Sequence, residues 1–145
     1  MTKPFEDLKS AIASGNLPAV AFYKPVGRYN EHPGYGDLAT GDAHVAEIIG
    51  LLQQSPNWKD IAVIVTADEN GGSWDSVAPP PGDRWGPGLR VPTLIVSPYA
   101  KRGFVDHTVY DTTSILKTIE LRFDLPPLAT RDARAADLRN AFDFN

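Results

Sequence analysis

The stretch TADENGGSWD places two acids, Asp68 and Glu69, side by side directly after an apolar run. Adjacent carboxylates repel one another, so a fold that holds both of them ionised usually supplies a cation or strong hydrogen-bond donors nearby. A hard divalent metal ion is one such partner, and Gly71 and Gly72 would let backbone approach a ligand because glycine tolerates a positive φ. The alternative is that Glu69 points into solvent and Asp68 only caps the turn that follows.

Two histidines lie in loops that follow other apolar runs. His32 stands in NEHPG, where the following proline restricts its backbone to extended conformations, and His107 stands in VDHTVYDTTS beside two aspartates. Each alone could be an exposed loop histidine. Together with Asp68 on one edge, they would form a cluster able to bind a metal or an anionic group such as phosphate. We expect His44 on the surface, because it falls in the first turn of a predicted helix.

The elements that must position these residues alternate between strands and helices. Three short apolar runs predict strands, and apolar residues at helical spacing, preceded by capping residues, predict helices. Two segments predict long loops, which in compact domains are often functional: 26–42, rich in glycine and polar residues, and 69–90, rich in proline and glycine. The predicted strands cover 19–23, 61–68 and 91–98; the predicted helices cover 4–13, a stretch capped by Asp42, a stretch beginning near Asp111 or Thr112, and a short stretch after Thr130.

This order of elements is typical of an α/β layer with a mainly parallel sheet and helices on both faces. The run from Ile61 is apolar without alternation, which favours a strand covered above and below. Ligands bind beyond the carboxyl ends of parallel strands, so His32, Asp68 and His107 would emerge at one edge. Only three strands are predicted, whereas sheets average about five or six, so we expect part of a larger sheet.

Composition narrows the possible functions. The 145 residues match one domain or a piece of one. The formal charge of -4 and the scattered basic residues argue against nucleic acid as a partner. No run approaches the roughly 20 apolar residues of a transmembrane segment, and the first residues lack the apolar core of a signal peptide. There are no cysteines, which excludes disulfides and thiolate chemistry.

The sequence resembles the phosphoesterase family of bacterial acid phosphatases and non-specific, phosphatidylcholine-type phospholipases C. The resemblance rests on LPAVAFYKP, NEHPG, SPNWKDIAVIVTADENGGSWDSVAPPP, GLRVPTLIVSPYAKRGFVDHTVYDTTSILKTIE and FDLPPLATRDA, in that order. It implies part of an α/β sandwich related to alkaline phosphatases. It also implies hydrolysis of phosphate esters, in some members through a hydroxyl that becomes phosphorylated, and export to the periplasm or out of the cell.

The resemblance also implies roles for single residues. Asp68 and Glu69 match an acidic pair that binds a metal or organises the phosphate site, and His32 matches a histidine placed to contact the phosphate or the metal. Asp75 falls where the family has an aspartate before a histidine, but a serine follows it here. His107 matches a loop that varies within the family. The candidate catalytic residues are therefore His32, Asp75 and His107, and the candidate ligands of a divalent metal are Asp68 and Glu69.

Family members are much longer, and the resemblance covers only their C-terminal part. Their N-terminal metal-binding motif and their serine or threonine nucleophile have no counterpart here. We therefore expect the chain to be a C-terminal fragment of a hydrolase that acts on phosphate-ester small molecules or phospholipids. We expect the fragment alone to be weakly active or inactive, because the nucleophile, the metal and the charged groups of such a site act together. The alternative is a non-catalytic α/β module that self-associates, as a homo-oligomer, or binds a partner through exposed sheet surface.

Overall fold

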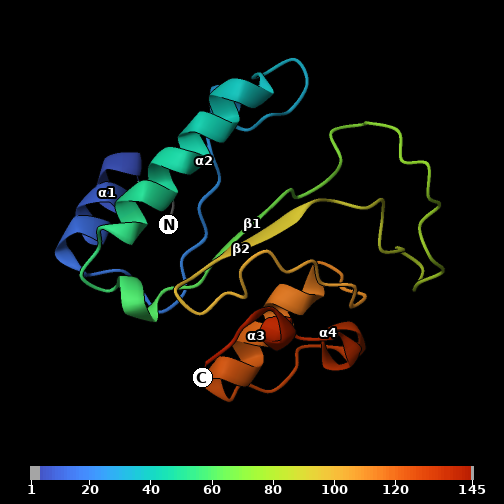
Figure 1. Cartoon of the computed structure of the whole chain (residues 1–145). Helices are drawn as coiled ribbons and strands as arrows, with labels where there is room; N and C mark the ends of the chain where they lie inside the picture. The colour runs from blue at the N-terminus through green and yellow to red at the C-terminus, as the bar shows by residue number, and fades with distance from the viewer. Residues whose placement is uncertain (1–3, 145) are drawn as a thin grey trace. The chain divides into compact units, whose positions relative to one another are not determined.

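A computed structural model describes residues 4–144, which divide into two units. The first unit comprises the chain up to Val65 together with Val96–Pro98, and the second comprises Thr66–Ile95 together with the chain from Tyr99 onward. Helices and loops make up most of both units, and one small sheet is present (Figure 1). This mixture is consistent with the predicted α/β class. The prediction of one domain, or a piece of one, stays a prediction.

The first unit is built on helices α1 (Phe5–Ser14) and α2 (Leu38–Gln53), with the 3-10 turns η1 (Gly27–Tyr29) and η2 (Trp58–Asp60). Helix α1 follows Pro4 and ends at Gly15, whose φ of 70° suits glycine, so the helix predicted at 4–13 is confirmed. Ser55 Oγ donates to the carbonyl of Ile12 over 2.9 Å, which ties the end of α2 to α1.

Helix α2 begins earlier than predicted. Its N-cap is Asp37, whose carboxylate accepts a hydrogen bond from the Thr40 N–H over 2.8 Å, whereas the predicted cap, Asp42, lies inside the helix. Asp37 satisfies one of the free N–H groups of the first turn, so the helix starts there despite its glycine and threonine content.

The segment 19–23 is not a strand, which corrects the prediction. It is irregular in the described structure, and Phe22 is 84% exposed. An apolar run forms a strand only when a neighbouring strand pairs with its backbone, and no such neighbour is present among the described residues.

The sheet consists of β1 (Val63–Thr66) and β2 (Thr93–Val96). Thr66 Oγ1, at the end of β1, lies 2.9 Å from the carbonyl oxygen of Pro92 and 3.0 Å from Thr93 Oγ1, at the start of β2. The two strands therefore run in opposite directions, and the loop 67–92 leaves and re-enters the sheet at the same end (Figure 1). The predicted parallel pairing is wrong here, because this loop contains no helix that would carry the chain back to the other end.

The second unit contains α3 (Thr113–Phe123), α4 (Thr130–Arg134) and the 3-10 helix η3 (Leu138–Ala141). The predicted helices after Asp111 and after Thr130 are both confirmed. The hydroxyl of Thr118 accepts a hydrogen bond from the N–H of Leu138 over 2.9 Å, and Leu138 is only 3% exposed. This contact joins α3 to η3.

Few large apolar side chains are buried among residues 4–144. The buried ones are Ile12, Leu52 and Leu138, while Leu94 of β2 is 64% exposed and Val109 is 85% exposed. In the same range, every helix is too short or too polar to cross a bilayer.

Candidate functional site

The acidic pair follows β1 after a single intervening residue. Asp68 and Glu69 are both exposed, and Glu69 Oε2 accepts a hydrogen bond from the Gly71 N–H over 2.8 Å. Gly71 and Gly72 have φ values of 64° and 75°, in the left-handed region that glycine tolerates, and the predicted approach of their backbone to a ligand stays a prediction. A Cβ on Gly72 would meet no atom within 4 Å, so its backbone conformation rather than crowding requires glycine.

Asp75 anchors the second half of the loop. Its carboxylate accepts two hydrogen bonds from the Arg90 guanidinium, over 2.9 and 2.7 Å, and further bonds from the N–H groups of Val77 and Arg90. The Arg90 side chain, followed by the Val77 N–H, holds the pKa of Asp75 well below its ordinary value. Asp75 is therefore an ionised structural link across the loop, and its predicted catalytic role stays a prediction.

An open hollow of about 480 Å³ lies beside this ion pair. The hollow is lined by residues that follow the acidic pair and by residues that precede β2. Trp74, which is 93% exposed, is one of the lining residues. Its lining comprises Asn70, Ser73, Trp74, Asp75, Arg90, Val91 and Pro92.

His107 is exposed, and it lies on a turn organised by the preceding residue, Asp106. The Asp106 carboxylate accepts hydrogen bonds from the Thr108 N–H, the Tyr110 hydroxyl and the Asn140 amide, over 2.7 to 3.1 Å. Burial opposes ionisation of Asp106, but these hydrogen bonds outweigh it and lower its pKa to about 2. The His107 turn is thus held by a carboxylate that is ionised at neutral pH.

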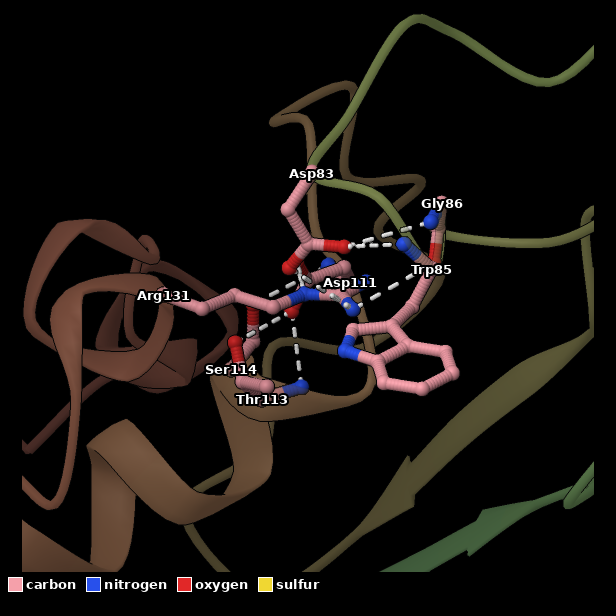
Figure 2. A network of polar contacts seen from close by, with 7 residues as sticks. All are labelled: Asp83, Trp85, Gly86, Asp111, Thr113, Ser114 and Arg131. Atoms are coloured by element: carbon pink, nitrogen blue, oxygen red, sulfur yellow. Dashed lines mark hydrogen bonds and ion pairs between the residues drawn. The ribbon is translucent and has the colours of Figure 1, made fainter.

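Arg131 links this region to the long loop, as Figure 2 shows. Its Nε lies 3.2 Å from Oδ2 of Asp111, and the other carboxylate oxygen, Oδ1, accepts from the Thr113 N–H at the start of α3. Its Nη1 lies 3.9 Å from Asp83 and 3.4 Å from the carbonyl of Gly86. The sequence prediction missed this network, because no local pattern relates an arginine in α4 to a turn more than forty positions earlier.

His32 belongs to the first unit, whereas the other four candidates belong to the second. Its Nδ1 lies 2.9 Å from the carbonyl oxygen of Pro33, and its N–H donates to Asn30 Oδ1 over 3.0 Å. The ring of Tyr35 meets the imidazole edge-on at 5.4 Å. These contacts orient the ring within its own loop, and a site shared with Asp68 stays a prediction.

His44 is buried rather than on the surface, which corrects the prediction. It is 5% exposed, its Nε2 lies 2.7 Å from the Tyr23 hydroxyl, and its Nδ1 lies 3.4 Å from Glu47. Its ring stacks on Tyr29 with centroids 4.3 Å apart and meets Phe5 of α1 at 5.0 Å. Because α2 starts earlier than predicted, His44 lies past its first turn, on the face packed against these aromatic rings.

The donor set of the acidic pair suits a hard cation only in part. Carboxylate oxygens are the ligands that Mg²⁺ and similar ions prefer, and Asp68 and Glu69 supply them from adjacent positions. Within residues 4–144, however, no three His, Asp or Glu side chains are grouped closely enough to hold a metal ion. The acidic pair would therefore be part of a ligand set, and metal binding stays a prediction.

The described fold is that of a mixed α/β protein whose acidic pair follows strand β1. The chain belongs to the Phosphoesterase family, whose sequence profile matches residues 1–126. It is 31% identical to Phospholipase C B of Mycobacterium tuberculosis, over 95% of this chain and 32% of that protein. It is also 30% identical to the non-hemolytic phospholipase C of Pseudomonas aeruginosa, over 99% of this chain and 26% of that protein. With non-specific phospholipase C6 of Arabidopsis thaliana the identity is 32%, over 88% of this chain and 31% of that protein.

These comparisons confirm the family that the sequence motifs indicated. The chain spans between a quarter and a third of the length of these relatives. The described sheet has two strands, so the wider alkaline-phosphatase-like sandwich stays a prediction.

Proposed function

We propose that this chain takes part in the hydrolysis of phosphate esters, with phospholipids as one substrate class. The observation that carries the proposal is the family match over residues 1–126, which includes the acidic pair after β1. The relatives, which are phospholipases C from bacteria and a plant, support phospholipids in particular.

Under this proposal, Asp68 and Glu69 hold a hard divalent metal ion, which would neutralise charge on the phosphoryl oxygens when bound. Both side chains are exposed at the end of β1, so they are accessible to an ion and to substrate. His107 would donate a hydrogen bond to the phosphoryl group, and Asp75 would keep the loop behind the acidic pair in place through Arg90. The role proposed for His32, contact with a phosphate or a metal, concerns its own loop in the first unit. Together these residues supply charge and position, but none of them is the expected hydroxyl nucleophile.

The proposal includes a dependence on groups outside these 145 residues. Phosphoryl transfer needs a nucleophile, a metal and charge clamps assembled together, and the relatives are three to four times longer than the part matched here. We therefore propose that the 145-residue chain alone hydrolyses p-nitrophenyl phosphate and phosphatidylcholine far more slowly than a longer protein that contains it. Equal rates for the two would refute this part of the proposal.

Calorimetric titration with Mg²⁺, Mn²⁺ and Zn²⁺ tests the metal site directly. We expect Asp68→Asn and Glu69→Gln each to weaken metal binding by about tenfold or more, as loss of a charged ligand does. Asp42→Asn is the matched control, because Asp42 is an exposed acid of the other unit. Unchanged affinity in both site variants would refute the assignment of these two ligands.

A second candidate function, self-association without catalysis, is favoured by the exposed apolar side chains. Phe22, Leu94 and Val109 are between 64% and 85% exposed, so each of the two units leaves apolar side chains uncovered. Sedimentation velocity over a wide concentration range tests this candidate, and Leu94→Lys should abolish any dimer that forms through β2. A monomer at every concentration would refute it.

We also propose a periplasmic or secreted location, which rests on the family resemblance alone. Fractionation of cells that express the natural gene tests it, and recovery of the protein in the cytoplasmic fraction would refute it.

A further inference from the structure

Arg131 meets two segments of the second unit that are far apart in the sequence. Its Nε faces Asp111, at the start of α3, and its Nη1 faces Asp83 and the carbonyl of Gly86, in the long loop (Figure 2). The Arg131 side chain is 32% exposed, so its guanidinium lies between these acceptors rather than extending into water. A planar guanidinium with five N–H groups can serve several fixed acceptors at once, which the point charge of a lysine cannot do.

Each of the two segments contains a turn that a carboxylate closes. In the loop, Asp83 Oδ1 accepts from the N–H groups of Trp85 and Gly86, over 2.8 and 3.2 Å, which closes a tight turn. At α3, Asp111 Oδ1 accepts from the Thr113 N–H over 2.7 Å. Arg131 therefore connects two preformed carboxylate turns.

Two further contacts of the loop act at other places. The pairing of Asp75 with Arg90 joins two parts of the loop to each other, and Thr66 joins the base of the loop to β2. The loop 67–92 contains no helix or strand of its own, so its position depends on such tertiary contacts.

The segments joined by Arg131 carry candidate site residues. The loop carries Glu69 and Asp75, and the segment that runs into Asp111 carries His107 on the turn organised by Asp106. Charged groups that act on one phosphoryl group must hold their mutual positions to within a fraction of an ångström to be effective. A residue that sets the distance between the two segments would therefore govern the site without touching the substrate.

We propose that Arg131 is a positioning residue, which fixes the loop 67–92 relative to the His107 segment by bridging Asp111 and the Asp83–Gly86 turn. Its importance for catalysis rests on the proposed function, but the positioning itself is a property of the folded chain and is measurable without substrate or metal.

The chain contains no cysteine, so two spin labels can be placed without background. Ser76→Cys in the loop and Val109→Cys beside the His107 turn are both exposed sites, and pulsed electron paramagnetic resonance gives the distribution of distances between them. The variants to compare in this doubly labelled chain are Arg131→Ala, Arg131→Lys, Asp111→Asn and, as the matched control, the exposed Arg134→Ala on the same helix.

We expect Arg131→Ala to widen the distance distribution by about twofold, as release of a loop from a tertiary contact does. Arg131→Lys should give a distribution of intermediate width, because lysine keeps the positive charge but lacks the planar guanidinium with its several N–H groups. Arg134→Ala should leave the distribution unchanged. If Arg131 only stabilised the fold, Arg131→Ala would lower the unfolding midpoint, but the folded molecules would keep the narrow distance distribution. That result would overturn the proposal.

Asp111→Asn keeps the proposal testable if Arg131→Ala does not fold. Asparagine can still accept from Thr113 through its oxygen but presents an amide to the guanidinium, so the distribution should widen while the circular dichroism of the helices is retained. An unchanged distribution in folded Asp111→Asn would overturn the proposal. These results are independent of hydrolysis and of metal titration, so a failure of the proposed function and a failure of the Arg131 assignment are distinguishable.

Discussion

Replacement of His44 by alanine tests the packing of its buried ring against aromatic side chains of the first unit. The imidazole is 5% exposed, its Nε2 lies 2.7 Å from the Tyr23 hydroxyl oxygen, and its ring contacts those of Tyr29 and Phe5. Loss of a buried hydrogen bond costs about 1 kcal/mol, and loss of a buried ring leaves a cavity that raises the total to about 3 kcal/mol. We expect His44→Ala to lower the free energy of unfolding by that amount.

Urea unfolding followed by circular dichroism measures this change, with the slope of the transition as a check that the unfolded state is unaltered. His107→Ala is the matched control, because His107 is exposed and should change stability by less than about 0.5 kcal/mol. Tyr23→Phe removes only the hydroxyl and should cost about 1 kcal/mol, since it leaves the buried Nε2 of His44 without its partner.

The double variant Tyr23→Phe with His44→Ala separates the hydrogen bond from the ring contacts. Both substitutions remove the same hydrogen bond. The double variant should therefore lose about 1 kcal/mol less free energy of unfolding than the sum of the losses in the two single variants. We infer that the contacts of His44 with Tyr23, Tyr29 and Phe5 hold the segment 19–30 against α1 and α2. If His44→Ala lowered the free energy of unfolding no more than His107→Ala, this inference would be refuted.

Three further predictions concern the second unit. Burial, followed by the neighbouring carboxylate of Asp132, raises the pKa of Glu120 above 4.5, so the folded state binds this proton more tightly than the unfolded state. The contribution of Glu120 to stability is therefore fully present below pH 4.5 and is lost as the pH rises through the folded-state pKa. Glu120→Gln should remove this loss, measured as urea midpoints between pH 4 and 8; an unchanged pH dependence would contradict the reasoning. Gly72→Ala should cost about 1 kcal/mol in the urea midpoint assay, because φ is 75° there, whereas no loss would show that the turn relaxes easily. Asp75→Asn should speed cleavage of the loop 67–92 by trypsin, because its carboxylate holds Arg90, and a rate equal to that of the unaltered chain would show that the loop is fixed by other contacts.

Local sequence signals predicted the elements whose ends are set by nearby residues. Helix α1 follows Pro4 and stops at Gly15, where the backbone turns left-handed, and α3 starts just after the Asp111 carboxylate that binds the Thr113 N–H. Gly71 likewise has a positive φ, which the sequence allows there because glycine has no Cβ. These outcomes depend on a few neighbouring residues, so the sequence alone was sufficient. The order of the motifs was also sufficient to indicate the family.

Features that depend on distant partners were decided only by the tertiary structure. The segment 19–23 has strand-like residues but no strand beside it, and β2 runs antiparallel to β1 because the intervening loop returns to the same end of the sheet. The burial of His44 follows from rings supplied by α1 and by the segment 19–30, and the role of Arg131 follows from acceptors in two other segments. In each case the deciding free energy comes from contacts between residues far apart in the chain, which local propensity and spacing do not encode.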